Sequence, residues 1–296
     1  MFNIKHLTSD EICELAASGR LKEIEGGLTG HELQQHTNDH HVNGLFAAIA
    51  GRCLRDVRGG MSADELSAAK GGFETALHVV AALGIYEQVR GRVTARQLAA
   101  ASRFGLSALH SAAVNGKLDY IPGGVTAEEL RRARADNTHS ALSSAALGKA
   151  LDQIRGGVTA SVLQADASLR GRTVLHTAVI MGVQHQISGG IPAAIKNKTN
   201  WNFPLGIAIE QKRVKGIKGC LELGASKHIF GRYLKDLGKI CTELPASAED
   251  FQPGRWPDFW FNSKADALEY FRAVAGIAQD LDLSELIPVE ITTALL

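Results

Sequence analysis

The chain repeats one short pattern at a nearly constant spacing. A glycine, a second small or basic residue, an aliphatic residue and usually a hydroxyl residue recur six times, with first glycines 33, 32, 32, 33 and 33 residues apart. These glycines are Gly26, Gly59, Gly91, Gly123, Gly156 and Gly189. Fourteen residues before them stand Ile12, Leu45, Leu77, Leu109, Leu142 and Leu175. Two signals in one register predict an array of similar units stacked on one another.

Each unit is predicted to contain two short helices. A hydroxyl residue followed by small apolar residues, as in Ser107-Ala108-Leu109-His110, suits the start of one helix. The glycines can end a helix, and the hydroxyl after them has a Glu or Gln three residues later, which is the spacing of a capping box. This spacing occurs at Thr8–Glu11, Thr29–Glu32, Ser62–Glu65, Thr94–Gln97 and Thr126–Glu129. Thr159 lacks it and Pro192 replaces the hydroxyl of the last unit, so the pattern fades toward the C-terminal side.

Over residues 8–226 the pattern resembles the ankyrin-repeat family. The resemblance rests on the unit length, the Thr-x-Leu-His tetrapeptides, the alanine pairs after them and the ankyrin-like unit of residues 203–226. It implies an all-α solenoid of about seven units over residues 1–226, with residues 227–296 as a helical C-terminal cap. The Gly-Gly-aliphatic-Thr-Ala segment departs from the family, as in residues 123–127. This departure predicts that a short extra helix, such as residues 127–134, occupies part of the place of the usual projecting β-hairpin.

The resemblance also implies a function: binding of another protein on a concave face, as a scaffold, an inhibitor or a bacterial effector. When the contact positions of the family are transferred to the aligned positions of each repeat, the expected contact residues are Glu74, Arg103, Phe104, Asn137, His139, Arg170 and Arg172. Taken one by one, these positions also suit variable, solvated loops. The resemblance assigns His78, His110 and His176 to hydrogen bonding at helix starts, with Ser143 as the departure.

Beyond residue 227 the period is lost. Amphipathic spacing predicts a helix over residues 233–244, and Ser263 is a plausible N-cap for a helix over residues 264–280. Seven of the seventeen aromatic residues fall between residues 251 and 271, among them Trp256 and Trp260. Such a cluster suits a cap that covers the end of the solenoid, and the alternative is an aromatic anchor for a partner.

Charge is nearly balanced over the chain, with a net charge of +1, but it is segregated near the end. Residues 196–240 carry +7, whereas residues 241–296 carry −7. Solvated helix faces that attract each other account for this pattern, because exposed ion pairs are weak. The alternative is an anionic partner, or nucleic acid, bound by Lys212, Arg213, Lys215 and Lys218.

No motif indicates catalysis or a cofactor. The glycine pairs are not followed by Gly-Lys-Ser/Thr, and neither a nucleophile elbow nor a His-Glu-x-x-His occurs. His36 and His40 have metal-ligand spacing, but Asn38 and Asp39 between them suggest a turn, so no metal is expected. The chain is therefore predicted to be a binding protein. The alternative is an enzyme with its active site in residues 227–296 and the solenoid as its substrate-recognition arm.

Composition predicts a cytoplasmic protein without a membrane span. The longest stretch free of Asp, Glu, Lys and Arg, residues 173–195, is interrupted by glycine, proline, histidine and glutamine. Asp10, Glu11 and Glu14 stand where a signal peptide needs an apolar core. The four cysteines are far apart and make no Cys-x-x-Cys, as expected of free buried thiols. Neither the oligomeric state nor export to a host cell is readable from this pattern.

Overall fold

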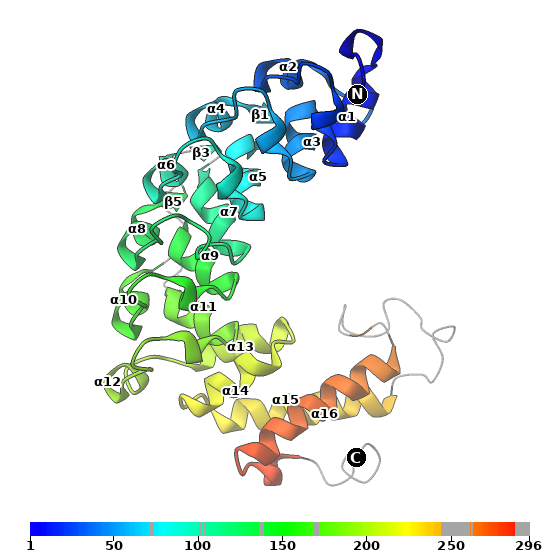
Figure 1. Ribbon diagram of the computed structural model, residues 1–296. Coiled ribbons are helices and arrows are strands. Elements are labelled where there is room, and N and C mark those ends of the chain that lie inside the picture. The colour runs from blue at the N-terminus through cyan, green and yellow to red at the C-terminus, as the bar shows by residue number, and fades with distance from the viewer. Residues whose placement is uncertain are drawn as a thin grey trace. The chain divides into compact units, whose positions relative to one another are not determined.

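A computed structural model describes residues 1–71, 74–100, 102–103, 105–135, 139–167, 172–243, 261 and 263–287. Most of these residues are helical, which confirms the predicted class at that level (Figure 1). The chain divides into two compact units. The N-terminal unit comprises Met1–Ala178 with His185–Gly190, and the C-terminal unit comprises Val179–Gln184 with Ile191–Leu296. The expected boundary at residue 226 stays a prediction.

Two rows of short helices build the N-terminal unit, and Figure 1 shows them alternating along the chain. The inner helices are α1 (Ser9–Ala17), α3 (Gly44–Ala50), α5 (Ala76–Leu83), α7 (Ala108–Val114), α9 (Ala141–Leu147) and α11 (Val174–Ile180). The outer helices are α2 (Gly30–Gln35), α4 (Ala63–Ala68), α6 (Ala95–Ala100), α8 (Ala127–Arg132) and α10 (Ala160–Ala165). Single 3₁₀ turns follow several inner helices: η2 (Leu21–Glu23), η3 (Leu54–Asp56), η4 (Tyr86–Gln88) and η5 (Leu151–Gln153), while η1 (Ile4–His6) precedes α1.

The inner helices pack against one another in chain order, from α1 to α9. The repeated apolar residue identified in the sequence lies at the centre of this packing, because Ile12, Leu45, Leu109 and Leu142 are all fully buried. Small residues let the helices approach closely. A Cβ atom at Gly148 would lie 2.3 Å from the carbonyl oxygen of Ala113, so no larger residue fits there without a backbone shift.

The predicted capping boxes form at the outer helices and at α1. Thr29 Oγ1 accepts a hydrogen bond from the backbone N–H of Glu32 at 3.2 Å, and Glu32 Oε2 accepts one from the backbone N–H of Thr29 at 2.7 Å. The same reciprocal pair forms at Thr8–Glu11, Ser62–Glu65, Thr94–Gln97 and Thr126–Glu129. Thr159 makes no such bond, as its sequence predicts. These caps satisfy N–H groups that would otherwise lack partners at helix starts.

The expected extra helix is confirmed, since α8 occupies Ala127–Arg132, but short β-hairpins are present beside such helices, which the all-α expectation did not include. Strands β1 (Lys70–Gly71) and β2 (Glu74–Thr75) pair antiparallel; β3 (Ser102–Arg103) pairs with β4 (Leu106–Ser107) and β5 (Arg134–Ala135) with β6 (His139–Ser140). A backbone bond closes the hairpin loop, as from Ala76 N to Ala69 O at 2.8 Å. Each outer helix has only six residues, which leaves enough chain for both elements.

Backbone hydrogen bonds also join successive units at the glycine turns. Each runs from the residue just before a glycine pair to the aliphatic residue of the preceding unit. The bonds are Arg58 N to Leu28 O, Arg90 N to Met61 O, Arg155 N to Val125 O and Ser188 N to Val158 O, at 2.7–2.8 Å. Pro122 occupies the equivalent position between Arg90 and Arg155 and has no N–H to donate. There Arg92 Nη2 donates to Pro122 O at 3.2 Å instead.

Longer helices dominate the C-terminal unit: α13 (Asn202–Glu210), α14 (Val214–Glu222), α15 (Lys227–Glu243) and α16 (Lys264–Asp280), with the short α12 (Ala193–Lys196) before them and the 3₁₀ turn η8 (Ser284–Leu286) after them. The helix predicted over residues 264–280 is confirmed, and Ser263 caps it by accepting from Asp266 N at 3.1 Å. The helix predicted to begin at Tyr233 begins earlier, at Lys227. Helices α15 and α16 pack together, with Phe230 and Phe271 fully buried. Among the described residues, no helix is both long and apolar enough to cross a membrane.

Candidate partner-binding surface

The recurring histidines hold the inner helices to the edge of the next unit. His78 Nδ1 accepts a hydrogen bond from the backbone N–H of Thr75 at 3.3 Å. Because Nδ1 accepts, a neutral ring carries its proton on Nε2, which donates to the carbonyl oxygen of Leu106 at 3.0 Å. His110 repeats this arrangement, and its Nε2 lies 3.2 Å from the carbonyl oxygen of His139. A buried imidazole therefore fixes the backbone position of an exposed residue 28 or 29 positions further along.

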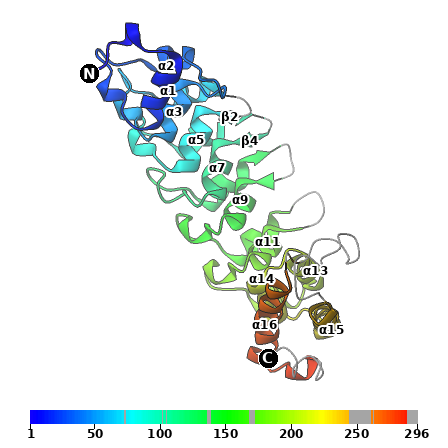
Figure 2. The same cartoon turned by 90° about the vertical axis from the view of Figure 1, so that its right-hand side faces the viewer.

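From the second unit onward, one side chain per unit stands immediately before the hydroxyl or amide residue that starts an inner helix. These residues are Val42, Glu74, Leu106, His139 and Arg172, and we refer to them as the edge row. Val42 is 41% and Leu106 50% exposed; Glu74 and His139 are exposed, and Arg172 is partly buried. Figure 2 shows β2 and β4, which carry Glu74 and Leu106, following each other along one edge of the N-terminal unit. The edge row thus presents five different side chains at one repeated backbone position.

Three of the contact residues expected from sequence, Glu74, His139 and Arg172, belong to the edge row. Arg103 lies in β3, where its backbone pairs with Leu106, and its side chain is outside the described part of the structure. Phe104, Asn137, Arg170, Trp256 and Trp260 lie outside the described residues. Sequence reasoning missed Val42 and Leu106. The signal was present, because both directly precede a helix-starting residue, as Glu74 and His139 do.

Arg172 is the least exposed charged member of the edge row. Burial lowers the pKa of its guanidinium, and its Nε atom is buried without a hydrogen-bond partner among the described residues. Its positive charge adds to burial in lowering the pKa of His176, one turn into α11. The row therefore changes from apolar and acidic at Val42 and Glu74 to basic at Arg172, which gives it a direction along the stack.

At their C-terminal ends, the inner helices α7 and α9 expose an apolar strip made of Val114 and Leu147. Val114 at the end of α7 is 47% exposed, and Leu147 at the equivalent position of α9 is 43% exposed. Ser111 and Ser144 lie one turn earlier on the same helices and are half-buried. A partner that lies on the C-terminal ends of α7 and α9 would cover both aliphatic side chains.

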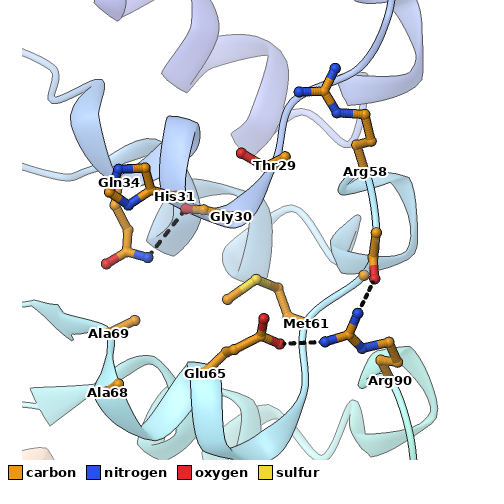
Figure 3. Close-up of a pocket in the computed structure, with 12 residues that line it drawn as sticks. Thr29, Gly30, His31, Gln34, Arg58, Met61, Glu65, Ala68, Ala69 and Arg90 are labelled. Carbon is orange, nitrogen blue, oxygen red and sulfur yellow. Dashed lines mark hydrogen bonds and ion pairs between the residues drawn. The ribbon is translucent and has the colours of Figure 1, made fainter.

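A hollow of about 370 Å³ lies between the outer helices α2 and α4 (Figure 3). His31 and Gln34 line it from α2, and Glu65 and Met61 lie across from them. Its charged groups are already engaged. Arg90 donates to the carbonyl oxygen of Gly59 at 2.8 Å and to Glu65 Oε2 at 2.9 Å, so the hollow is bordered by ion pairs that join two units.

The histidines near the N-terminus do not gather around one point. His36 Nδ1 lies 3.2 Å from the Ser9 hydroxyl, and His31 pairs with Gln35 at 3.1 Å. The structure, in the residues it describes, contains no group of three or more His, Cys, Asp or Glu side chains that could hold a metal ion.

In the C-terminal unit, part of the basic segment is engaged within the unit. Lys218 Nζ forms an ion pair with Asp280 Oδ2 at 2.7 Å, which raises the pKa of the lysine. Lys212 Nζ lies 4.1 Å from the ring centre of Phe261, a cation–π contact. These two contacts link the basic segment to α16 and to the aromatic segment before it, as expected of mutual attraction between the oppositely charged segments.

Comparison with known proteins adds no assignment, since no protein-family model and no curated protein sequence matches the chain.

Proposed function

We propose that the chain is a protein-interaction module, built as an ankyrin-like solenoid of about seven units with a helical C-terminal cap. Its partner is another protein, which lies across the edge row and the apolar strip of α7 and α9. We assign it no catalytic residue, metal or cofactor and place it in the cytoplasm, as a scaffold, an inhibitor or an exported effector. Binding rather than catalysis follows from repetition, since equivalent residues one unit apart do not converge on one small substrate.

The observation that carries this proposal is a constant backbone with variable side chains. At Leu106 and His139, the carbonyl oxygen of the edge residue is held by a buried histidine of the preceding unit. The side chains at these positions are respectively apolar and titratable, and at Glu74 the side chain is acidic. A rigid frame that displays unlike side chains limits the entropy lost on binding and gives selectivity.

The test compares two triple variants of the full chain. In the first, Glu74→Ala, Leu106→Ser and His139→Ala change the edge row. In the matched control, His31→Ala, Arg96→Ala and Glu128→Ala change exposed residues of the outer helices α2, α6 and α8. A partner captured from cell lysate and identified by mass spectrometry is purified and titrated against each variant.

We expect the edge variant to bind at least about tenfold more weakly, and the control within about twofold of the parent chain. Melting temperatures of all three proteins are measured alongside. Equal affinities for the two folded variants would contradict the proposed surface.

A second candidate function is binding of an anionic partner through α15. His228, Arg232 and Lys235 are exposed at spacings of four and three residues, which places them on one face of a 17-residue helix. A labelled single-stranded oligonucleotide tests this alternative. Affinity that falls steeply with salt and is lost in Arg232→Gln with Lys235→Gln supports it, whereas binding that is absent at low salt rejects it.

A further inference from the structure

A second hollow, of about 590 Å³, lies beside the first two inner helices of the chain, α1 and α3. Helices α1 and α3 and the loop of residues 38–42 form its walls. Ala17, Ala47 and Ala50 line it from the two helices and Val42 lines it from the loop, so much of its surface is apolar. Ala17, Ala50 and Val42 are exposed, and the hollow is open to solvent.

The hollow exists because two side chains are small. Ala17 and Ala50 each stand five residues after the buried apolar residue of their helix, which is the position of Val114 in α7 and Leu147 in α9. The larger side chains project from the surface in those later units, where they are 47% and 43% exposed. Alanine at both of the first two positions leaves that volume empty.

Carboxylates border this hollow. Asp10, Glu14 and Asp39 line it, and among its lining residues the basic side chain is that of His40, with neither lysine nor arginine present. Asp10 Oδ1 accepts a hydrogen bond from the backbone N–H of Asp39 at 3.0 Å, which holds the loop against α1. Glu14 and Asp39 are exposed, and they line the hollow from α1 and from the loop respectively.

We propose that this hollow receives a long basic side chain, arginine or lysine, of the protein partner; this inference rests on the proposed interaction function and names one element of the partner. The aliphatic part of such a side chain covers Ala17, Ala50 and Val42, while its charged end meets Glu14 and Asp39. Arginine and lysine combine an apolar stem with a cationic head in this way. No other natural side chain matches both an apolar floor and an acidic border.

The test uses the full chain with ¹³C-labelled alanine methyl groups and two capped tripeptides as probes. One is acetyl-Gly-Arg-Gly-amide, and the other carries citrulline, which has nearly the same shape as arginine without its charge. We expect the arginine peptide to shift the methyl signals of Ala17 and Ala50 and to bind at least about fivefold more tightly than the citrulline peptide. Equal binding of the two peptides, or no binding of either, overturns the inference.

Two variants locate the site. Ala17→Leu with Ala50→Leu fills the hollow as Leu147 does in α9, and it should abolish binding of the arginine peptide. Glu14→Gln with Asp39→Asn keeps the shape and removes two charges, and it should weaken binding about five- to twentyfold. The matched control is Glu25→Gln, an exposed carboxylate outside the hollow, which should change nothing. Unchanged affinity in the charge variant overturns the inference even if the leucine variant misfolds.

Failure here is distinguishable from failure of the proposed function. The triple change in the edge row should leave peptide binding intact, because Glu74, Leu106 and His139 do not line this hollow. A partner that binds through the edge row while the arginine peptide does not bind refutes only the present inference.

Discussion

The hydroxyl of Ser140 donates a hydrogen bond to the carboxylate of Asp166, a residue of the following unit that is only 2% exposed. Arg134 Nη2 donates to the other carboxylate oxygen. This is the unit in which Ser143 stands where His78 and His110 stand elsewhere. Asp166 therefore supplies from the next unit the acceptor that an imidazole supplies within the units of His78, His110 and His176, and the missing histidine is compensated.

Removing this carboxylate should be costly. We expect Asp166→Ala to lower the free energy of unfolding by about 1–3 kcal/mol, because Ser140 loses its buried acceptor and Arg134 its ion-pair partner. Adding Ser143→His restores the local pattern and should recover part of the loss. Urea denaturation measures both variants, with the exposed Asp152→Asn as a control. A loss no larger than that of the control would contradict the compensating role.

Replacing Lys149 by glycine should stabilise the fold. Lys149 follows α9 with φ +58°, a left-handed conformation that L-residues adopt at a cost, and the equivalent Gly116 after α7 has φ +65°. We expect Lys149→Gly to raise the free energy of unfolding by about 0.5–1 kcal/mol and Gly116→Ala to lower it by a similar amount. Thermal unfolding checks both changes. A decrease on introducing glycine at position 149 would show that the lysine side chain contributes more than its backbone costs.

Stability should decline between pH 6.5 and 4.5. Burial lowers the pKa of His110 and of His176 below the ordinary value of 6.5. Below pH 6.5 the unfolded chain therefore binds more protons than the folded chain. As the pH is lowered below 6.5, the free energy of unfolding decreases, whereas above pH 6.5 it does not change with pH through these groups. The capping carboxylates Glu32, Glu65 and Glu129 have lowered pKa values, so their contribution is lost only below about 4.5.

The measurement for this pH effect is urea denaturation at several pH values between 4.5 and 8. The variant His110→Gln should show a smaller slope between pH 4.5 and 6.5, whereas the exposed His6→Gln should keep the parent slope. Parallel curves for His110→Gln and the parent chain would exclude His110 as a source of the effect.

Two adjacent glutamates of α8 should differ in their effect on stability. Glu129 closes the capping box with Thr126, with its Oε2 accepting from the threonine N–H at 2.8 Å. Glu128 forms exposed ion pairs with Arg131 and Arg132. We expect Glu129→Ala to cost about 1 kcal/mol and Glu128→Ala clearly less, because caps contribute more than surface ion pairs. Denaturation in low and high salt checks the ranking, which reverses if the ion pairs dominate.

Local rules predicted much of the N-terminal unit. The Thr-to-Glu spacing identified capping boxes such as Thr29–Glu32, and the position of Leu109 identified a fully buried residue. Such features depend on residues three or four apart in the sequence, or on a position that repeats from unit to unit. Both can be recognised in the amino-acid sequence alone. The hairpins escaped prediction because strands of two residues leave no period to detect.

The candidate surface was only partly predictable for a related reason. Glu74 and His139 were expected from the register of the ankyrin resemblance, whereas Val42 and Leu106, at the equivalent positions, resemble core residues in composition. Their exposure follows from where β4 and the loop of residues 38–42 end, which depends on pairing across the hairpin. The link from Ser140 to Asp166 joins residues 26 apart, and the equivalent positions 69 and 133 hold alanine, so the repeat pattern did not reveal it.

Pro122 interrupts the series of backbone hydrogen bonds that join successive units at the glycine turns. Arg58, Arg90, Arg155 and Ser188 each carry a backbone link to the unit before. This boundary lacks that link and is held by the side chain of Arg92, by the bond from His78 to Leu106 and by the packing of α5 on α7. In an array whose units contact only their neighbours, each boundary transmits cooperativity separately. Under partial denaturation, the glycine turns beside Pro122 should therefore separate first, while α5 and α7 stay packed on each other.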